Sequence, residues 1–360
     1  MSDAPKEPAP FEIACCIAME DSQVFHHLAP LAMHPMVTRL WIIRTHASAT
    51  GKIPKVRYVL TPEVRRPARW IRMLRECRRI AARPEVRAFV SFNPFPYGLI
   101  GAAAARRQGK PVHFGFIGSD WYRHMKGPQG RLLRPLVQNA SFYTCTGEEM
   151  RTDMVHDGFD GGRVASLPHC VDLERFDVRE PDRADYTCIF VGKLIERKRV
   201  DVILHAFAEV LRTHPNETLC ILGRGPLEAE CRALAGTLGI ESAVDFAGFH
   251  DNVEEYYGRA RIDLIASHTE GYPFSLVEGI CCGLVPVSTP AGTIADHIRD
   301  GENGLLVPIG DAPAMANAIR RLLDEPALYE RLRGEALKMR DDYSYERATE
   351  VWDSWLRRMT

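Results

Sequence analysis

The sequence predicts an α/β protein made of two doubly wound domains, each with a parallel sheet covered by helices on both faces. Short apolar and β-branched runs alternate along the chain with segments of helical spacing, which is typical of βαβ units. The chain has 360 residues, which is long for one hydrophobic core. Pro and charged residues interrupt the periodicity over 166–186, so we expect a first domain at 1–172 and a second at 173–342.

The first domain is expected to contain five strands. They are the apolar runs at 11–19, 38–45, 88–93, 112–118 and 141–146. The spacing of Met73, Cys77 and Ile80 predicts an amphipathic helix over 65–83, whose polar face carries eight arginines. This helix either only buries its apolar stripe on the sheet or also contacts an anionic membrane surface.

The second domain has the more regular pattern. Helices are expected at 200–214 and 226–239, and a last helix at 343–360. The six expected strands lie at 187–192, 218–223, 243–248, 261–267, 285–289 and 304–308. The last helix carries an apolar stripe of Tyr345, Ala348, Val351, Trp352 and Trp355.

The composition is that of a folded protein in a reducing compartment. The chain is 46% hydrophobic and 26% charged, and no apolar run is long enough to span a membrane. Its polar, Pro-rich start lacks the form of a secretory signal. Ten cysteines without a C-x-x-C pair indicate buried free thiols in the cytoplasm rather than disulfides or a zinc site.

Charge is divided unequally between the two domains. Residues 1–172 hold 24 Lys and Arg against 15 Asp and Glu, a net charge of about +9, and the remainder carries about −10. This asymmetry predicts different partners for the two domains. Nucleic acid is not among them, because the basic stretch lacks a recognisable binding module and interleaved aromatic residues.

Cationic and glycine-rich turns follow two strands of the second domain. In GKLIERKR (192–199), Lys193 and Lys198 precede a helix, an arrangement that suits an anion such as a diphosphate. The alternative there is a solvated charged loop. In GRG (223–225), Arg224 stands between two glycines, and the alternative is a simple tight turn.

Two glutamates flank another strand-to-helix turn, HTEGYPFSLVE (268–278). Glu270 lies in the loop and Glu278 in the helix, with seven residues between them. A carboxylate accepts paired hydrogen bonds from the vicinal hydroxyls of a ribose or hexose, and Gly271 lets the backbone approach a ligand closely. The alternative is structural, because Ser275-x-x-Glu278 has the form of a capping box and Glu270 suits the helix dipole.

Taken together, these stretches resemble the signature of the retaining glycosyltransferases of family 4 (group 1). The resemblance rests on GKLIERKR, LGRGP, EGYPFSLVE, AGT and NGLLVPIGD, in family order over 187–311, and on LPHCVDLERF at the family's hinge. It implies the GT-B fold, with a cleft between an acceptor-binding first domain and a second domain that binds a nucleotide sugar. It also implies that the helix at 343–360 packs back on the first domain.

The resemblance implies roles for individual residues. Lys193 and Lys198 would act in catalysis by holding the donor diphosphate, and Glu278 would bind the ribose hydroxyls. Glu270 would hold the transferred sugar and phosphate together with the backbone that follows it. The other donor-binding residues implied are Gly271, Tyr272, Pro273, Phe274, Ser275, Arg224 and Phe249. Arg199 stands where the family usually has Gly and would add charge near the phosphates.

The first domain fits the family pattern less closely. FIGSDW (116–121) stands where many members have a His-Gly-Ser-Asp element, with Ile117 in place of the histidine. Asp120 remains a candidate catalytic residue, with turn capping as its alternative, and His113 is expected to be a core histidine. The chain has no D-x-D motif, so no metal or other cofactor is expected, and Lys, Arg and helix N-termini would neutralise the leaving diphosphate.

The sequence therefore predicts a cytoplasmic enzyme that moves a sugar, with retention, from a nucleotide-diphosphate sugar to an acceptor glycan or lipid-linked glycan. The expected process is cell-surface polysaccharide or glycolipid biosynthesis, with the Arg-rich helix at the inner face of the cell membrane. Two alternatives stay open. One is a nucleotide-sugar epimerase of the same fold, which would need acid and base residues from both domains. The other is a non-catalytic protein that binds a nucleotide sugar without turnover.

Overall fold

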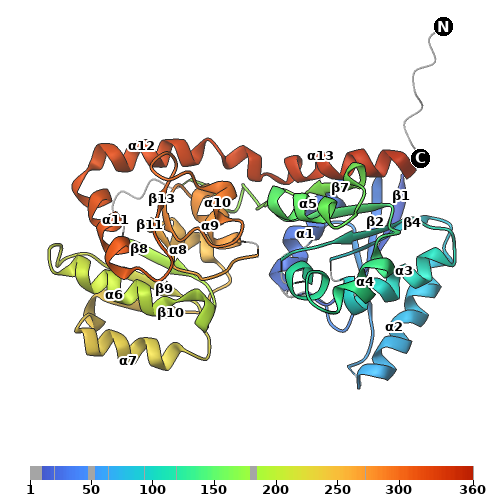
Figure 1. Cartoon of the computed structure of the whole chain (residues 1–360), viewed down its shortest axis with the longest axis horizontal. Helices are drawn as coiled ribbons and strands as arrows, with labels where there is room; N and C mark the ends of the chain where they lie inside the picture. The colour runs from blue at the N-terminus through green and yellow to red at the C-terminus, as the bar shows by residue number, and fades with distance from the viewer. Residues whose placement is uncertain are drawn as a thin grey trace, which may run out of the picture. The chain divides into compact units, whose positions relative to one another are not determined.

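A computed structural model of the chain describes residues 10–19, 21–47, 53–63, 65–92, 94–118, 120–178, 185–271 and 273–359. The chain forms two compact units (Figure 1). The first unit comprises Met1–Cys170 and Tyr345–Thr360, and the second comprises Val171–Ser344. The sequence places these boundaries after residues 172 and 342.

The first unit is built on a parallel sheet of seven strands in the order β3-β2-β1-β4-β5-β6-β7. The strands are β1 (Phe11–Cys16), β2 (Val37–Arg44), β3 (Val56–Leu60), β4 (Val86–Ser91), β5 (Val112–Gly115), β6 (Phe142–Cys145) and β7 (Val164–Ser166). The five predicted strands are confirmed, and β3 and β7 are additional. Both lie at sheet edges, where a strand needs a less continuous apolar run to be stable.

Helices cover both faces of this sheet. α1 (Asp21–Met33) and α13 (Tyr345–Leu356) pack on one face, where Trp352 and Trp355 are buried. The other face is covered by α2 (Arg66–Ala81), α3 (Leu99–Arg106), α4 (Gly130–Val137) and α5 (Gly147–His156). The apolar stripe predicted for the Arg-rich helix is confirmed, because Met73, Cys77 and Ile80 are buried against the sheet.

The second unit is built on a parallel sheet of six strands in the order β10-β9-β8-β11-β12-β13. The strands are β8 (Tyr186–Val191), β9 (Leu219–Leu222), β10 (Val244–Gly248), β11 (Ala260–Ile265), β12 (Val285–Ser288) and β13 (Leu305–Leu306). All six predicted strands are confirmed. The strand order reverses between β8 and β11, and ligands of doubly wound sheets bind at such a switch point.

Helices also cover both faces of the second sheet. One layer consists of α6 (Val200–Leu211), α7 (Glu228–Leu238), α11 (Ala312–Asp324) and α12 (Pro326–Leu337). The other consists of α8 (Val253–Tyr257), α9 (Phe274–Cys281) and α10 (Ile294–His297). The turn at 192–199 therefore connects β8 to the first layer, and the loop from 266 connects β11 to the second.

All ten cysteines are free and buried, as the sequence predicts. Among the described residues, no helix is both long and apolar enough to cross a membrane. The same residues contain no group of three or more His, Cys, Asp and Glu side chains that could hold a metal ion.

Candidate active site

The turn after β8 carries consecutive cationic residues at the switch point of the second sheet. A short helical turn, Glu196–Lys198, ends at Arg199, whose left-handed backbone (φ 49°, ψ 47°) starts α6. Lys193, at the beginning of the turn, is exposed. The side chains of Arg197 and Lys198 both extend to the loop that follows β11, where they pair with the same carboxylate.

That carboxylate belongs to Glu270. One of its oxygens accepts hydrogen bonds from Lys198 Nζ and Ser267 Oγ, both at 2.6 Å, and the other accepts from Arg197 NH1 at 3.0 Å. Burial, which leaves Glu270 8% exposed, would raise its pKa. The charge of Lys198 and these hydrogen bonds outweigh burial, so the pKa of Glu270 is lowered from its ordinary value. Glu270 is therefore a fixed, charged group.

The loop that carries Glu270 rests on the glycine turn after β12. Gly292 has a φ of 57°, and a Cβ at this position would lie 1.8 Å from the Glu270 carbonyl oxygen. Thr293 Oγ1 donates to the Gly271 carbonyl oxygen at 3.3 Å. Because only glycine fits here, the AGT turn of the sequence lets the Glu270 loop pack directly against the turn after β12.

Glu278 lies on α9 beside a buried tyrosine. Tyr257 OH is 3.4 Å from Glu278 Oε2 and donates to the Ser275 carbonyl oxygen at 3.0 Å. Enclosure of the Glu278 carboxyl raises its pKa to about 7, although the charge of Arg175 and the Tyr257 hydroxyl oppose this shift. Glu278 can therefore be either charged or neutral near neutral pH.

The capping-box interpretation of Ser275 and Glu278 is wrong. α9 begins at Phe274, and its N-cap residue is Pro273, whose side chain makes no capping hydrogen bond. Proline offers no side-chain acceptor, so it cannot supply the capping hydrogen bond that a Ser or Thr at this position would supply. Ser275 consequently lies inside the first helical turn, and Glu278 does not cap the helix.

The other predicted donor-binding residues line the carboxyl edge of the same sheet. Arg224, after β9, and Phe249, after β10, are exposed, and a Cβ on Gly248 would lie 3.5 Å from Arg224 Nε. Pro273 is buried, and Gly271, Phe274 and Ser275 are half-buried. Tyr272 lies outside the described residues.

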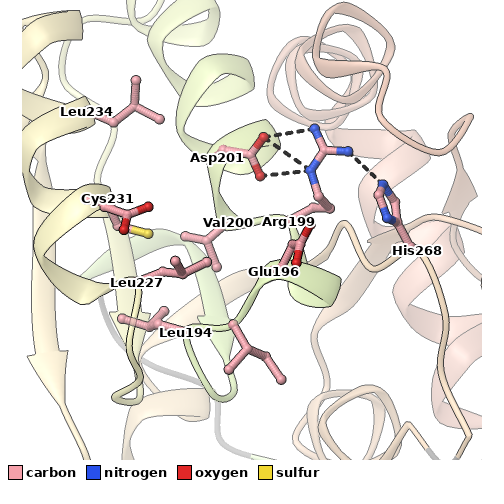
Figure 2. Close-up of a pocket in the computed structure, with 11 residues that line it drawn as sticks. Leu194, Glu196, Arg199, Val200, Asp201, Leu227, Cys231, Leu234 and His268 are labelled. Carbon is pink, nitrogen blue, oxygen red and sulfur yellow. Dashed lines mark hydrogen bonds and ion pairs between the residues drawn. The ribbon is translucent and has the colours of Figure 1, made fainter.

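Arg199 faces a pocket of about 550 Å³ between α6 and α7 (Figure 2). The apolar lining includes Leu194, Leu227 and Leu234. The Arg199 guanidinium pairs with Asp201 (2.8 Å from NH2 to Oδ2) and donates to His268 Nε2 (2.6 Å). Asp201 therefore offsets the charge of Arg199 at this pocket, and the expectation that Arg199 adds charge near donor phosphates stays a prediction.

Asp120, in the first unit, caps a turn. Its Oδ1 accepts hydrogen bonds from the amides of Ile117 (2.8 Å) and Trp121 (2.9 Å), and burial raises its pKa to about 7. Its Oδ2 has no hydrogen-bond partner within the part of the chain that the structure describes. His113 is fully buried and its Nε2 lies 2.9 Å from Thr144 Oγ1, so it is a core histidine, as predicted.

The sequence did not indicate three groups around the two glutamates: Ser267, Tyr257 and Asp263. Asp263 lies in β11, fully buried, and neither of its carboxyl oxygens has a hydrogen-bond partner among the described residues. Burial and the nearby charge of Glu278 raise the pKa of Asp263 well above its ordinary value. A usable signal was present, because an aspartate inside the apolar run RIDLIAS is expensive to bury unless it is neutral.

Comparison with known proteins is consistent across the chain. The family described as "Glycosyl transferases group 1" matches residues 173–339, and "Glycosyltransferase Family 4" matches residues 37–175. The D-inositol 3-phosphate glycosyltransferase of Acidothermus cellulolyticus is 37% identical over 41% of this chain and 35% of its own length. The enzyme of the same name from Frankia alni is 29% identical over 67% of this chain and 66% of its own length. The matches cover from 18% to 66% of the length of the curated relatives.

Solved structures extend the likeness to both units. Anabaena HepE, solved in complex with UDP, aligns with a TM-score of 0.79 at 15% identity, over 96% of this chain and 99% of that one. At this identity the likeness shows the fold. The two family matches together run from residue 37 to residue 339, and the chain therefore belongs to the group 1 glycosyltransferases, with the GT-B fold.

Proposed function

We propose that this chain transfers a sugar from a nucleotide-diphosphate sugar to an acceptor, with retention of configuration. The observation that carries the proposal is the switch-point cluster, in which Lys198 and Arg197 converge on the buried carboxylate of Glu270. Glu278 lies on the helix that directly follows this loop. In support, the structurally similar HepE was solved with UDP and with UDP-glucose.

The donor diphosphate would lie against the turn at 192–199. In the absence of a donor, Glu270 pairs with both Lys198 and Arg197 and offsets one of their two positive charges. A diphosphate brings negative charge to the same ammonium group, so Lys198 can exchange one anionic partner for another without being left unpaired and desolvated. Glu270 then has acceptor capacity for the hydroxyls of the transferred sugar.

The nucleoside would extend from this point along the sheet edge. Glu278 would accept hydrogen bonds from the ribose hydroxyls, and Arg224 and Phe249 would border the base. Lys193, which is exposed at the start of the turn, would supply a further positive charge beside the diphosphate.

Transfer exchanges one bond at the anomeric carbon for another. The bond to the diphosphate oxygen breaks, and the bond to the acceptor oxygen forms on the same face of the sugar. The proton of the acceptor hydroxyl passes to the leaving diphosphate. The protein would accelerate this step by positioning the reactants and by stabilising the charge that grows on the diphosphate, and Lys193 and Lys198 would supply the positive charge for this.

The first unit would bind the acceptor, and α2 gives it a surface suited to anionic lipid. The only acidic residue of α2, Glu76, pairs with Arg79 at 2.7 Å, which leaves a surplus of positive charge. Ile71 on the same helix is 55% exposed. A Lys or Arg near an anionic surface contributes about 1 kcal/mol. We therefore infer that the protein acts at the inner face of the cell membrane, on an acceptor of polysaccharide or glycolipid biosynthesis.

Donor binding is tested by thermal shift and calorimetry with UDP, GDP and ADP. At least one nucleoside diphosphate should raise the melting temperature, and its labelled sugar donor should be consumed in the presence of a cell lipid extract. Glu278→Gln is the matched variant for the ribose contact. If no nucleoside diphosphate binds, the donor-site proposal fails. If a donor is bound but only epimerised, the transferase assignment fails.

Membrane contact is tested by co-sedimentation with vesicles of phosphatidylglycerol and phosphatidylcholine. The triple charge reversal Arg72→Glu, Arg75→Glu and Arg79→Glu should abolish binding. The control reverses three exposed arginines of the second unit, Arg212, Arg232 and Arg331, so that both variants change the net charge equally. Equal loss in both variants would show that net charge, rather than α2, governs binding.

A further inference from the structure

Arg199 holds a backbone conformation that is uncommon for a residue with a side chain. Its φ is 49°, and in the described part of the chain Lys55 is the other non-glycine residue with a positive φ. This region of conformational space favours glycine. Such a residue persists where its surroundings hold it, and the contacts of the Arg199 side chain provide that support.

Those contacts join the start of α6 to the loop after β11 (Figure 2). Arg199 Nε donates to both carboxylate oxygens of Asp201, at 2.9 and 3.1 Å, and NH2 donates to Oδ2. Arg199 NH1 donates to His268 Nε2 at 2.6 Å. A guanidinium has no lone pair to offer, so His268 Nε2 is the acceptor in this contact.

The backbone on either side of His268 is tied to the same turn. The His268 amide donates to the Arg197 carbonyl oxygen at 2.9 Å, and Arg197 NH1 donates to the Thr269 carbonyl oxygen at 3.2 Å. Lys198 and Arg197 then hold the Glu270 carboxylate. Consecutive cations of one turn thus hold consecutive residues of the other loop.

We propose that Arg199 and His268 are positioning residues that latch the Glu270 loop to the turn at 192–199. The inference rests on the proposed function and adds two positioning residues to the same site. Arg197 and Lys198 would move their contacts from Glu270 to the donor phosphates. The Arg199–His268 contact lies on the pocket side of the turn, so it would keep the loop in place during that exchange.

Hydrogen exchange followed by mass spectrometry tests the latch without any substrate. The His268 amide reports directly, because it is bonded to the Arg197 carbonyl oxygen. Peptides that span 266–271 should exchange about fivefold faster in Arg199→Gly than in the wild type. His268→Gln keeps an acceptor for the Arg199 guanidinium, so its exchange should stay close to that of the wild type. His214→Gln, whose ring lies 3.0 Å from Asp324, is the matched control and should behave as the wild type. Equal exchange in the wild type and Arg199→Gly would overturn the proposal.

Turnover at one pH separates a latch from a general effect on stability. Near pH 8, His268→Lys places a permanent cation against Arg199, and Arg199→Gly removes the donor while it relieves the backbone. Both variants should lower kcat about tenfold with an unchanged affinity for nucleoside diphosphate. His268→Gln, which keeps an acceptor for Arg199, should retain most of the wild-type turnover. Unchanged kcat in both variants would overturn the proposal. If the wild type binds no nucleoside diphosphate, the proposed function fails, whereas the exchange experiment still decides whether the latch exists.

Discussion

The raised pKa of Glu278 predicts that nucleotide binding depends on pH. Burial brings the pKa of this carboxyl from 4.5 to about 7 in the protein without ligand. Ribose hydroxyls donate to the charged form, so binding lowers the pKa and releases a proton at and below neutrality. Glu278 is charged in about nine molecules in ten at pH 8 and in about one in ten at pH 6. Affinity for the nucleoside diphosphate should therefore fall about tenfold, or about 1.4 kcal/mol, between these two values.

Isothermal titration calorimetry at pH 6, 7 and 8, in buffers of different ionisation enthalpy, measures both the affinity and the proton released. Glu278→Gln is the control, because it cannot titrate while the nucleotide phosphates still do. It should bind about 1.5–3 kcal/mol more weakly than the wild type at pH 8, the range for hydrogen bonds to charged groups, and release no proton from this site. The same pH dependence in both proteins would refute the reasoning.

The raised pKa of Glu278 affects the stability of the fold in the opposite direction, because stability falls as the pH rises whereas nucleotide affinity increases. Because the folded-state pKa of Glu278 lies above its ordinary value, its contribution to stability is complete at acid pH and is lost as the pH rises through about 7. Glu278→Gln should therefore unfold at a higher urea concentration than the wild type at pH 8, although it binds nucleotide more weakly. A variant that loses both stability and affinity would point to a structural role instead.

Four further predictions concern the same cluster and its surroundings. Lys198→Met leaves Glu270 buried with a single cation, so it should lower the free energy of unfolding by about 3 kcal/mol in urea titrations. The double variant Lys198→Met, Glu270→Gln should recover most of that loss. Additive losses in the double variant would contradict the pairing. Gly292→Ala should lower the free energy of unfolding, measured by calorimetry, by at least about 2 kcal/mol. Gly301 has a similar φ of 73° but no atom of the described residues within 4 Å of where a Cβ would lie, so Gly301→Ala should lower it by only about 1 kcal/mol. Equal losses in the two variants would exclude the contact with the Glu270 carbonyl. Asp120→Asn keeps the turn cap and cannot ionise, so its melting temperature should exceed the wild-type value at pH 8 but not near pH 4, and a loss of turnover in this folded variant would assign Asp120 a catalytic role. EDTA should leave turnover unchanged, because cationic side chains neutralise the leaving diphosphate, and activity lost to EDTA and restored by Mg²⁺ would contradict this.

The strands of both sheets could be predicted where both faces of a strand are covered. Buried parallel strands need continuous apolar runs, and such runs are visible in a single sequence. β3 contains Arg57 among apolar residues, and β7 consists of Val164–Ser166 alone, so neither run differs from a loop at this level. Their position at the sheet edges supplies the stability that their own sequence does not.

The site could be predicted as a set of residues but not as a set of contacts. The turns and glutamates follow strands whose ends meet at one edge, so their proximity follows from the fold class. The sequence does not show that Lys198 and Arg197 share Glu270, because side-chain pairing depends on the packing of two separate loops. The capping-box alternative is wrong for a local reason, because the helix starts after Pro273 and Ser275 therefore lies inside its first turn.

The return of α13 to the first unit has a consequence for biosynthesis. Residues 171–344 form one compact unit, and they are synthesised before the helix that completes the other unit. Without that helix, the part of the first sheet's face that Trp352 and Trp355 cover lies open to solvent. Nascent chains, and chains cut short before α13, would therefore expose an apolar sheet face that invites aggregation. Deletion of the sixteen-residue segment Tyr345–Thr360 should therefore lower the recombinant yield, although the segment is short.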